Sequence, residues 1–330
     1  MKKFASILGA AVFALLPLSA CGGDNLTKLK INEVTHSVFY APLYLADSLG
    51  YFEEEGLKIE LTNGGGADAV MASVLSGDAD IGFCGPEAAI YVAIGGTNDQ
   101  PTVFAQLTKR DGSFLVGRKE EPNFKWTDLK GKEILAGRRG GVPAMTFEYI
   151  LREHGFADAD INFNFSVSFN NMTAAFMQGT ADYCTMFEPT ASEVQAEGKG
   201  YIVASVGEAS GEVPYTCYIA KRSWLDKHGE LADGFLRAIL KAIKYAEQED
   251  TETIANLLVD HFANTSAASL KVSVESYRAI HAWKSDMQMT QAGFDRLQDI
   301  IESAGELESR ADFTKLVDNS HAKAVYESLK

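Results

Sequence analysis

Two glutamates, Glu87 and Glu188, stand beside prolines at corresponding places in two stretches of similar design, residues 71–88 and 172–191. In each stretch an apolar, helix-like run ends at a glycine, and a short apolar strand then leads to the Glu and the Pro. A glycine there tolerates the left-handed conformation that ends many helices. Ligands of open α/β sheets bind just beyond the carboxyl ends of strands. The repeated pattern predicts two similar lobes that face each other across a cleft, each with a carboxylate at its edge.

Aromatic side chains accompany both glutamates at the predicted strand ends and turns. Rings beside a cleft can stack on a planar ligand, and carboxylates can accept hydrogen bonds from an amino-substituted or cationic ring. Burying two carboxylates without such partners would be costly. The candidate ligand-binding residues are Phe39, Tyr40, Gly66, Phe83, Glu87, Phe114, Arg138, Phe187, Glu188 and Tyr215.

A second ligand chemistry is also open. Gly66 ends a glycine run before a predicted helix, and Arg138 and Arg139 precede the Gly140-Gly141 turn. Guanidinium groups and helix N-termini bind oxyanions. A sulfonate, taurine or nitrate-type anion is therefore the alternative ligand, although a nearby glutamate would oppose it.

Strands that alternate with helices must position these residues. The expected strands are residues 29–34, 57–61, 102–107, 112–117, 201–206 and 213–220, and the chain is helical from Leu231 onward. This alternation indicates parallel α/β sheets, with the late helices packed back onto the first lobe. Cys84, Cys184 and Cys217 lie in apolar strands, where buried cysteines act as small hydrophobes. No spacing typical of a metal site occurs, and we expect neither metal nor cofactor.

Composition limits the class of protein. The chain has 330 residues, of which 46% are hydrophobic, enough for two cores. Its formal net charge is −15, which argues against nucleic acid as a partner. We expect a monomer.

The N-terminus has the pattern of a secretory signal. Lys2 and Lys3 precede an apolar run, and Leu-Ser-Ala-Cys at 18–21 resembles the bacterial lipobox. We expect a signal peptide at 1–20 and a lipidated tether at 21–28, with Cys21 acylated. The protein would be exported and held at the outer face of the cytoplasmic membrane, at a cell surface or in a periplasm, by this lipid anchor alone.

Four motifs carry a family resemblance, at residues 40–46, 50–57, 77–80 and 128–132. They are similar to motifs of the solute-binding proteins of ABC importers, in the cluster that takes up thiamine pyrimidine precursors, sulfonates, taurine, nitrate and riboflavin. The resemblance runs from about Leu29 to about Leu240. It implies an α/β, two-lobed, periplasmic-binding-protein-like fold of type II. We divide the chain into lobe I, residues 29–114 and 216–330, and lobe II, residues 115–215, joined by two crossing strands.

The resemblance implies partners and a ligand class. The lobes would close on a small molecule and deliver it to an ABC permease with its ATPase. We favour a heteroaromatic ring of the thiamine pyrimidine precursor type, stacked on Tyr40 or Phe187 and held by Glu188. On this hypothesis Glu188→Gln weakens binding of an amino-substituted ring.

An enzyme with the same fold is the remaining alternative. The eukaryotic thiamine-pyrimidine synthase places a lysine that holds pyridoxal phosphate, and then a reacting histidine, just after the strand that matches residues 81–83. This chain has Cys84 and Ala88 at those positions, and it lacks the cysteine-rich motif of the synthase at residues 183–187. We therefore expect a binding protein and not an enzyme.

Overall fold

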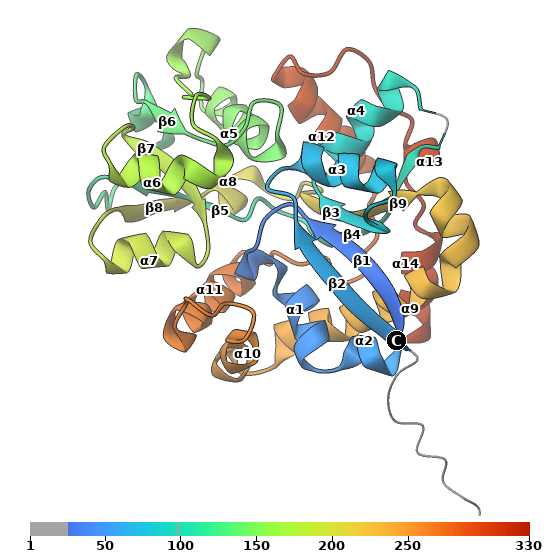
Figure 1. Cartoon of the computed structure of the whole chain (residues 1–330). Helices are drawn as coiled ribbons and strands as arrows, with labels where there is room; N and C mark the ends of the chain where they lie inside the picture. Colours follow the sequence, from blue (N-terminus) through green and yellow to red (C-terminus); the bar gives the residue numbers. More distant parts are fainter. Residues whose placement is uncertain (1–25, 98) are drawn as a thin grey trace, which may run out of the picture.

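The computed structural model of the protein describes residues 26–97 and 99–330 (Figure 1). The expected signal peptide and the acylation candidate Cys21 lie outside these residues. None of the helices in the described part of the chain combines the length and apolar character needed to cross a membrane.

Two β-sheets organise the molecule (Figure 1). The first sheet has the order β2-β1-β3-β9-β4, and the second has the order β6-β7-β5-β8. The strands of the first sheet are β1 (Thr27–Glu33), β2 (Leu57–Asn63), β3 (Ile81–Cys84), β4 (Pro101–Thr108) and β9 (Thr216–Lys221). Those of the second are β5 (Ser113–Gly117), β6 (Ile134–Leu135), β7 (Tyr183–Phe187) and β8 (Tyr201–Ser205). The expected strands are thus confirmed, with ends that shift by a few residues.

The sheets are mixed, and the prediction of purely parallel sheets is wrong. β1 pairs in parallel with β2 and β3, whereas β9 runs antiparallel to both β3 and β4. In the second sheet β5 runs antiparallel to β7 and β8. Each reversed strand is the first strand after the chain crosses from one sheet to the other. The chain leaves the first sheet after β4 and enters the second at β5, and it returns to the first sheet at β9 after β8. The alternation of residue types carries no information about this reversal.

The repeated helix–glycine–strand design is confirmed in both sheets. Helix α3 (Ala67–Ser76) ends at Gly77, which has φ 86°, and β3 follows. Helix α6 (Met172–Met177) is followed by Gly179, which has φ 94°, and then by β7. A side chain is strained at such positive φ values, so glycine is required at both turns.

The other helices cover the two sheets (Figure 1). Those in the first part of the chain are α1 (Ala41–Ser48), α2 (Tyr51–Glu54), α4 (Glu87–Gly95), α5 (Val142–Glu153), α7 (Thr190–Ala196) and α8 (Val206–Ser210). The late helices are α9 (Arg222–Gln248), α10 (Thr251–Leu258), α11 (Ala267–Ala279), α12 (Gln291–Ser303), α13 (Phe313–Leu316) and α14 (Ser320–Ser328). Short 3-10 turns are η1 (Val38–Tyr40), η2 (Trp126–Leu129), η3 (Asp158–Asp160) and η4 (Phe169–Asn171).

The late helices contact both halves of the molecule. Helix α9 packs against α1, α2 and α14 through buried residues such as Phe235 and Ile239. Helix α12 instead packs against α5, and α11 packs against α7. Arg296 of α12 also donates a hydrogen bond to the carbonyl of Ser210, at 2.5 Å. Helices α9 and α14 thus contact strands of the first sheet, whereas α11 and α12 contact helices α7 and α5, which lie within the residue range predicted for lobe II.

Candidate functional site

A cavity of about 70 Å³ lies between the two sheets. The loop after β1, the N-termini of α3, α4 and α5, and the chain around Phe187 and Tyr215 form its wall. A cavity of about 150 Å³ is known to hold benzene. A six-membered ring would therefore enter this smaller cavity only with some separation of its two sides.

Glu87 is the first residue of α4, and its side chain lies in the wall of the cavity. The residue is 2% exposed, and its Oε2 has no hydrogen-bond partner among the described residues. The side chain curls over Gly85, where an added Cβ would lie 2.0 Å from Oε2. Burial raises the pKa of Glu87 to about 7, although Arg138 and the backbone N–H groups of Glu87, Ala88 and Val142 oppose the shift. An unsatisfied buried carboxyl is costly, so this atom is the strongest sign of a missing hydrogen-bond donor.

Helix N-termini give the cavity an opposite electrostatic character. Helix α3 begins after Gly66, and α5 begins after Gly141. Neither cap residue supplies a side chain to the first backbone N–H groups, and the first N–H of α5, that of Val142, faces the Glu87 carboxyl. Arg138 lines the same cavity and lies 3.7 Å from Asp68 of α3. The cavity therefore combines one buried carboxyl with several donors.

Aromatic rings form the remaining wall. Tyr40, Phe169, Phe187 and Tyr215 line the cavity. The centroids of the Phe187 and Tyr215 rings are 6.4 Å apart, and those of Phe169 and Phe187 are 6.2 Å apart. The Tyr40 hydroxyl accepts a hydrogen bond from Thr216 at 3.4 Å, so it is held within the wall. These rings offer stacking surfaces for a planar ligand.

Six of the ten candidate residues line the cavity: Tyr40, Gly66, Glu87, Arg138, Phe187 and Tyr215. Three others lie behind this wall. Phe39 is fully buried, 5.8 Å from Phe187 between ring centroids. Phe83 lies between Tyr40 and Tyr218, and Phe114 lies 6.1 Å from Tyr277. These three rings support the lining residues and do not face the cavity.

Glu188, the tenth candidate, finds its partners within the chain. Its Oε1 accepts from the Ser192 hydroxyl at 2.7 Å and from Ser276 at 3.3 Å, and its Oε2 accepts from the Ser192 backbone N–H at 2.9 Å. Glu188 precedes its proline, and its side chain reaches forward to Ser192 in the first turn of α7, whereas Glu87 follows its proline and faces the cavity. Burial raises the pKa of Glu188. The two glutamates of the repeat therefore have different surroundings.

Several lining residues were missed from the sequence. Thr35, Phe169 and Thr216 lie in the wall beside the predicted residues. Phe169 belongs to η4, in a stretch without a periodic apolar pattern, and only its aromatic type could have drawn attention to it. Thr35 and Thr216 are polar residues next to strands, a signal too common to select them.

Direct bonds join the two sides of the cavity. Tyr91 of α4 donates a hydrogen bond to the carbonyl of Gly140 at 3.0 Å. The Ser37 hydroxyl, in the loop after β1, donates to the carbonyl of Glu188 at 2.7 Å. The described structure therefore has its two sides in contact, as a closed state requires.

The Tyr91 bond allows a first prediction. Tyr91→Phe removes one neutral hydrogen bond of the closed state, about 1 kcal/mol, and should shift the protein toward an open form. Small-angle scattering of the ligand-free protein should then give a larger radius of gyration. Tyr245→Phe is the control, since no hydrogen bond of the Tyr245 hydroxyl is found in the described structure, and an unchanged radius in Tyr91→Phe would contradict the prediction.

Cys84, Cys184 and Cys217 are buried and form no disulfide, as their apolar context predicts. Among residues 26–97 and 99–330, no group of three or more His, Cys, Asp or Glu side chains is placed to hold a metal ion.

Comparisons with known proteins give similarities in sequence and in fold. The sequence profile of the family described as NMT1/THI5 like matches residues 38–253. The Bacillus subtilis protein named "Putative binding protein YtlA" is 41% identical over 96% of this chain and 95% of its own. A 4-amino-5-hydroxymethyl-2-methylpyrimidine phosphate synthase of Aspergillus parasiticus is 27% identical over 64% of each chain.

Solved structures share the fold at low sequence identity. The alkanesulfonate-binding protein SsuA of Xanthomonas axonopodis, bound to MOPS, superposes with a TM-score of 0.73 at 16% identity, over 90% of this chain and 100% of that one. The periplasmic nitrate-binding protein NrtA of Synechocystis gives a TM-score of 0.75 at 15% identity, over 92% and 89%. The chain therefore has the two-lobed periplasmic-binding-protein fold.

Proposed function

The chain belongs to the NMT1/THI5-like family, and from this premise we propose that it is the solute-binding component of an ABC importer. The relative with 41% identity is named as a binding protein, and the structural neighbours include binding proteins for alkanesulfonates and nitrate. The cavity between the two sheets is where such a protein would hold its ligand. A permease is then the expected partner.

We propose that the ligand is a small aromatic ring that carries an amino group, of the thiamine pyrimidine precursor type. The observation that carries this proposal is Glu87 Oε2, a buried acceptor without a partner, in a cavity with aromatic walls. An amino group would supply the missing donor. Tyr40 and Phe187 would supply the stacking surfaces. The role first given to Glu188 passes to Glu87, because Glu188 already has three donors.

A sulfonate or nitrate-type oxyanion is the second candidate. It is favoured by Arg138 and by the N-termini of α3 and α5 at the same cavity. Glu87 with a pKa of about 7 could be neutral in slightly acidic medium and would then not repel an anion. The two candidates therefore differ in the Glu87 protonation state that they require.

An enzyme is the less favoured interpretation. The synthase relative is more distant than the binding protein. Cys84, at the position that corresponds to the lysine of the synthase, is a fully buried thiol whose pKa burial raises well above its ordinary value. It cannot hold an aldehyde cofactor as a lysine amine does.

Capture would proceed by hinge closure of the proposed lobe I, residues 29–114 and 216–330, on the proposed lobe II, residues 115–215. The open and closed states would differ by a few kcal/mol, and ligand contacts would supply the difference. We also propose export and a lipid anchor at Cys21. Cys21→Ser should abolish incorporation of labelled fatty acid and release the protein from the membrane fraction.

Thermal unfolding with a ligand panel tests the proposal. The panel holds 4-amino-5-hydroxymethyl-2-methylpyrimidine, thiamine, riboflavin, taurine, an alkanesulfonate and nitrate. A ligand present at about a thousand times its dissociation constant adds roughly 4 kcal/mol to stability, which raises the midpoint by several degrees. A shift with the pyrimidine alone supports the amino-ring ligand. A shift with the anions alone overturns that ligand in favour of the oxyanion, and no shift with any member rejects both ligand classes.

A further inference from the structure

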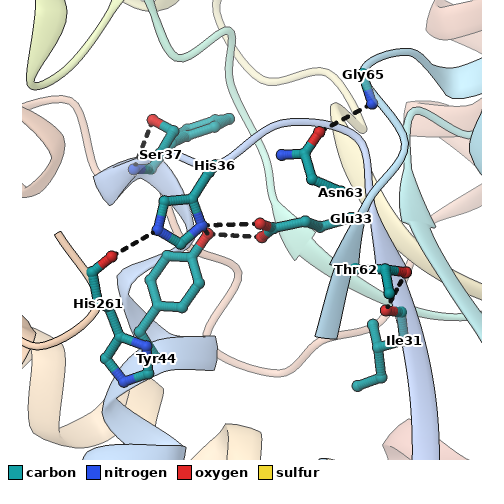
Figure 2. A network of polar contacts seen from close by, with 10 residues as sticks. Ile31, Glu33, His36, Ser37, Tyr44, Thr62, Asn63, Gly65 and His261 are labelled. Atoms are coloured by element: carbon teal, nitrogen blue, oxygen red, sulfur yellow. Dashed lines mark hydrogen bonds and ion pairs between the residues drawn. The ribbon is translucent and has the colours of Figure 1, made fainter. Parts of the chain in front are cut away.

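His36 lies between two hydrogen-bond acceptors, as Figure 2 shows, and it directly follows the cavity-lining residue Thr35. Its Nδ1 is 2.8 Å from Glu33 Oε1, and its Nε2 is 2.9 Å from the backbone carbonyl oxygen of His261. A carbonyl oxygen only accepts, so Nε2 must carry a hydrogen. The other oxygen of Glu33, Oε2, accepts from the Tyr44 hydroxyl at 2.6 Å, which suits an ionised carboxylate. Nδ1 also lies 3.1 Å from the Tyr44 hydroxyl. With that hydroxyl donating to Glu33 Oε2, Nδ1 donates to Glu33 Oε1, and this arrangement is that of an imidazolium.

The surroundings of His36 favour this charged form. Burial lowers the pKa of His36, but the bonds to Glu33 and to the His261 carbonyl, with the charge of Glu33, outweigh this and leave the pKa raised. Glu33 is 2% exposed and needs a cationic partner or donors. The ring also packs against Phe262, with centroids 4.5 Å apart.

Titratable groups on three elements face this cluster. Glu33 comes from β1, Tyr44 and Asp47 come from α1, and Asp260 and His261 come from the segment after α10. Burial lowers the pKa of His261, so its side chain is neutral at pH 7. Burial also raises the pKa of Tyr44 well above its ordinary value. His36 is therefore the group of this cluster whose charged form the surrounding contacts favour, and whose loss of a proton would change the contacts of its own loop.

The loop that carries His36 forms part of the cavity wall. This cleft loop, residues 34–37, joins β1 to η1, which ends at Tyr40. Val34 and Thr35 line the cavity. The Ser37 hydroxyl makes the bond to the Glu188 carbonyl that joins the two sides. The position of His36 therefore fixes both a wall of the cavity and a contact of the closed state.

We propose that His36 is a positioning residue for ligand capture: its doubly protonated ring holds the cleft loop in the capturing position, and loss of one proton releases the loop and weakens binding. This inference rests on the proposed function, because it takes the cavity as the ligand site. When Nδ1 loses its hydrogen, its lone pair faces a carboxylate oxygen at 2.8 Å. The interaction then turns from attraction to repulsion, or the Tyr44 hydroxyl, 3.1 Å from Nδ1, turns from Glu33 to Nδ1; in either case Glu33 loses a donor.

The sign of the pH dependence follows from this geometry. A histidine with a raised pKa contributes its interaction fully below the unfolded-state pKa, and the contribution is lost as pH rises through the folded-state pKa. The contribution of His36 to ligand affinity should therefore be largest below the His36 pKa and be lost as pH rises through it, in addition to the separate effect of Glu87. Without ligand, the protection of the cleft loop from hydrogen exchange should also decrease as pH rises through the His36 pKa.

Two measurements on the native full-length protein test the proposal. The first is NMR titration of the His36 Cε1–H resonance. The second is hydrogen exchange of a peptide covering residues 34–40, corrected for the intrinsic rate at each pH. We expect exchange of this segment to rise about tenfold as the pH passes through the His36 titration. In His36→Gln, exchange should be fast at every pH, and in Glu33→Gln the transition should move to lower pH.

A second histidine–carboxylate pair supplies the matched control. His321 Nδ1 lies 2.7 Å from Asp233 in the contact of α14 with α9. His321→Gln should leave the exchange profile of residues 34–40 unchanged. An unchanged wild-type profile through the His36 titration would overturn the proposal. So would a pH dependence that persists in His36→Gln but disappears in His261→Gln.

The final arm separates this proposal from the choice of ligand. Affinity for 4-amino-5-hydroxymethyl-2-methylpyrimidine is measured from pH 5 to 9 in the wild type and in His36→Gln. An affinity advantage of the wild type over His36→Gln that shrinks as pH rises supports the positioning role, because the Glu87 effect is common to both proteins. A difference that stays constant with pH overturns it. If this probe does not bind at any pH, the proposed ligand fails, and the ligand-independent exchange result still decides the role of His36.

Discussion

Glu87→Gln is expected to weaken binding of an amino-substituted pyrimidine by roughly 10- to 100-fold, because it replaces a charged acceptor with a neutral one. Glu87 Oε2 is buried in the cavity wall and lacks a partner among the described residues. The amide of a glutamine keeps one acceptor oxygen, but its nitrogen can only donate. An amino group of the ligand would therefore lose one acceptor, and its bond to the remaining oxygen would no longer be charge-assisted.

The same substitution should stabilise the ligand-free protein at pH 8. The pKa of Glu87 rises from 4.5 to about 7 on folding, and each unit corresponds to about 1.4 kcal/mol. For a carboxyl with a raised pKa, full stability is present below the unfolded-state pKa and is lost as pH rises through the folded-state pKa. Glutamine does not ionise, so the gain in unfolding free energy approaches about 3 kcal/mol above pH 7. Lower affinity with higher stability is typical of a binding residue.

The pH dependence of binding distinguishes the two ligand classes. An amino ring needs the carboxylate, so its affinity should rise as pH increases toward 7. An oxyanion needs the neutral carboxyl, so its affinity should fall over the same range. We would measure ligand affinity by calorimetry for the wild type and for Glu87→Gln at each pH. A change in the protonation of the ligand itself affects both proteins equally, so it cancels in the difference between their affinities. The difference between the two proteins then reports Glu87 alone.

Glu188→Gln is the matched control for this experiment. Glu188 is equally buried, at 1% exposed, but its oxygens bond to Ser192 and Ser276. Its substitution should reduce stability more than affinity, because the partners in α7 and α11 lose an acceptor. A larger loss of affinity in Glu188→Gln than in Glu87→Gln would contradict the assignment and restore the hypothesis drawn from the sequence.

Much of the fold could be predicted because it depends on local patterns. The runs around Gly77 and Gly179 contain their own stop signals, and both glycines have the positive φ that the pattern requires. The antiparallel direction of β5 and β9 could not be predicted in this way. Strand direction depends on where the chain passes between the sheets, which is a property of the whole topology and not of any short stretch.

The candidate site was predicted less completely for a physical reason. Being at a strand end places a residue near the cleft but does not determine where its side chain points. Phe39 and Phe83 turn into the core, where larger apolar contact is available. Glu188 is drawn to the first turn of α7, whose free N–H groups compete with any ligand. Backbone N–H groups of α4 and α5 also act on Glu87, but its Oε2 has no hydrogen-bond partner among the described residues.

Gly112→Ala is expected to lower the thermal midpoint by several degrees and to weaken ligand binding at the same time. Gly112 lies between β4 and β5, where the chain passes from one sheet to the other. A Cβ at this position would lie 2.7 Å from three carbons of the Phe39 ring. Phe39 cannot withdraw easily, because its ring also packs 5.0 Å from Tyr277 and 5.4 Å from Tyr40 between centroids. Overpacking of this kind costs about 1–3 kcal/mol.

Binding should change because Tyr40, next to Phe39, lines the cavity. Gly95→Ala is the control, since a Cβ there meets nothing within 4 Å and alanine favours the helix. Phe39→Leu removes ring atoms from the contact, so the double variant Gly112→Ala/Phe39→Leu should be less destabilised than the sum of the two single variants. Strict additivity would mean that Gly112 acts through its backbone and not through Phe39. The coupling, measured both in thermal midpoint and in ligand affinity, therefore shows whether the packing at the crossing between the sheets also sets the shape of the cavity wall.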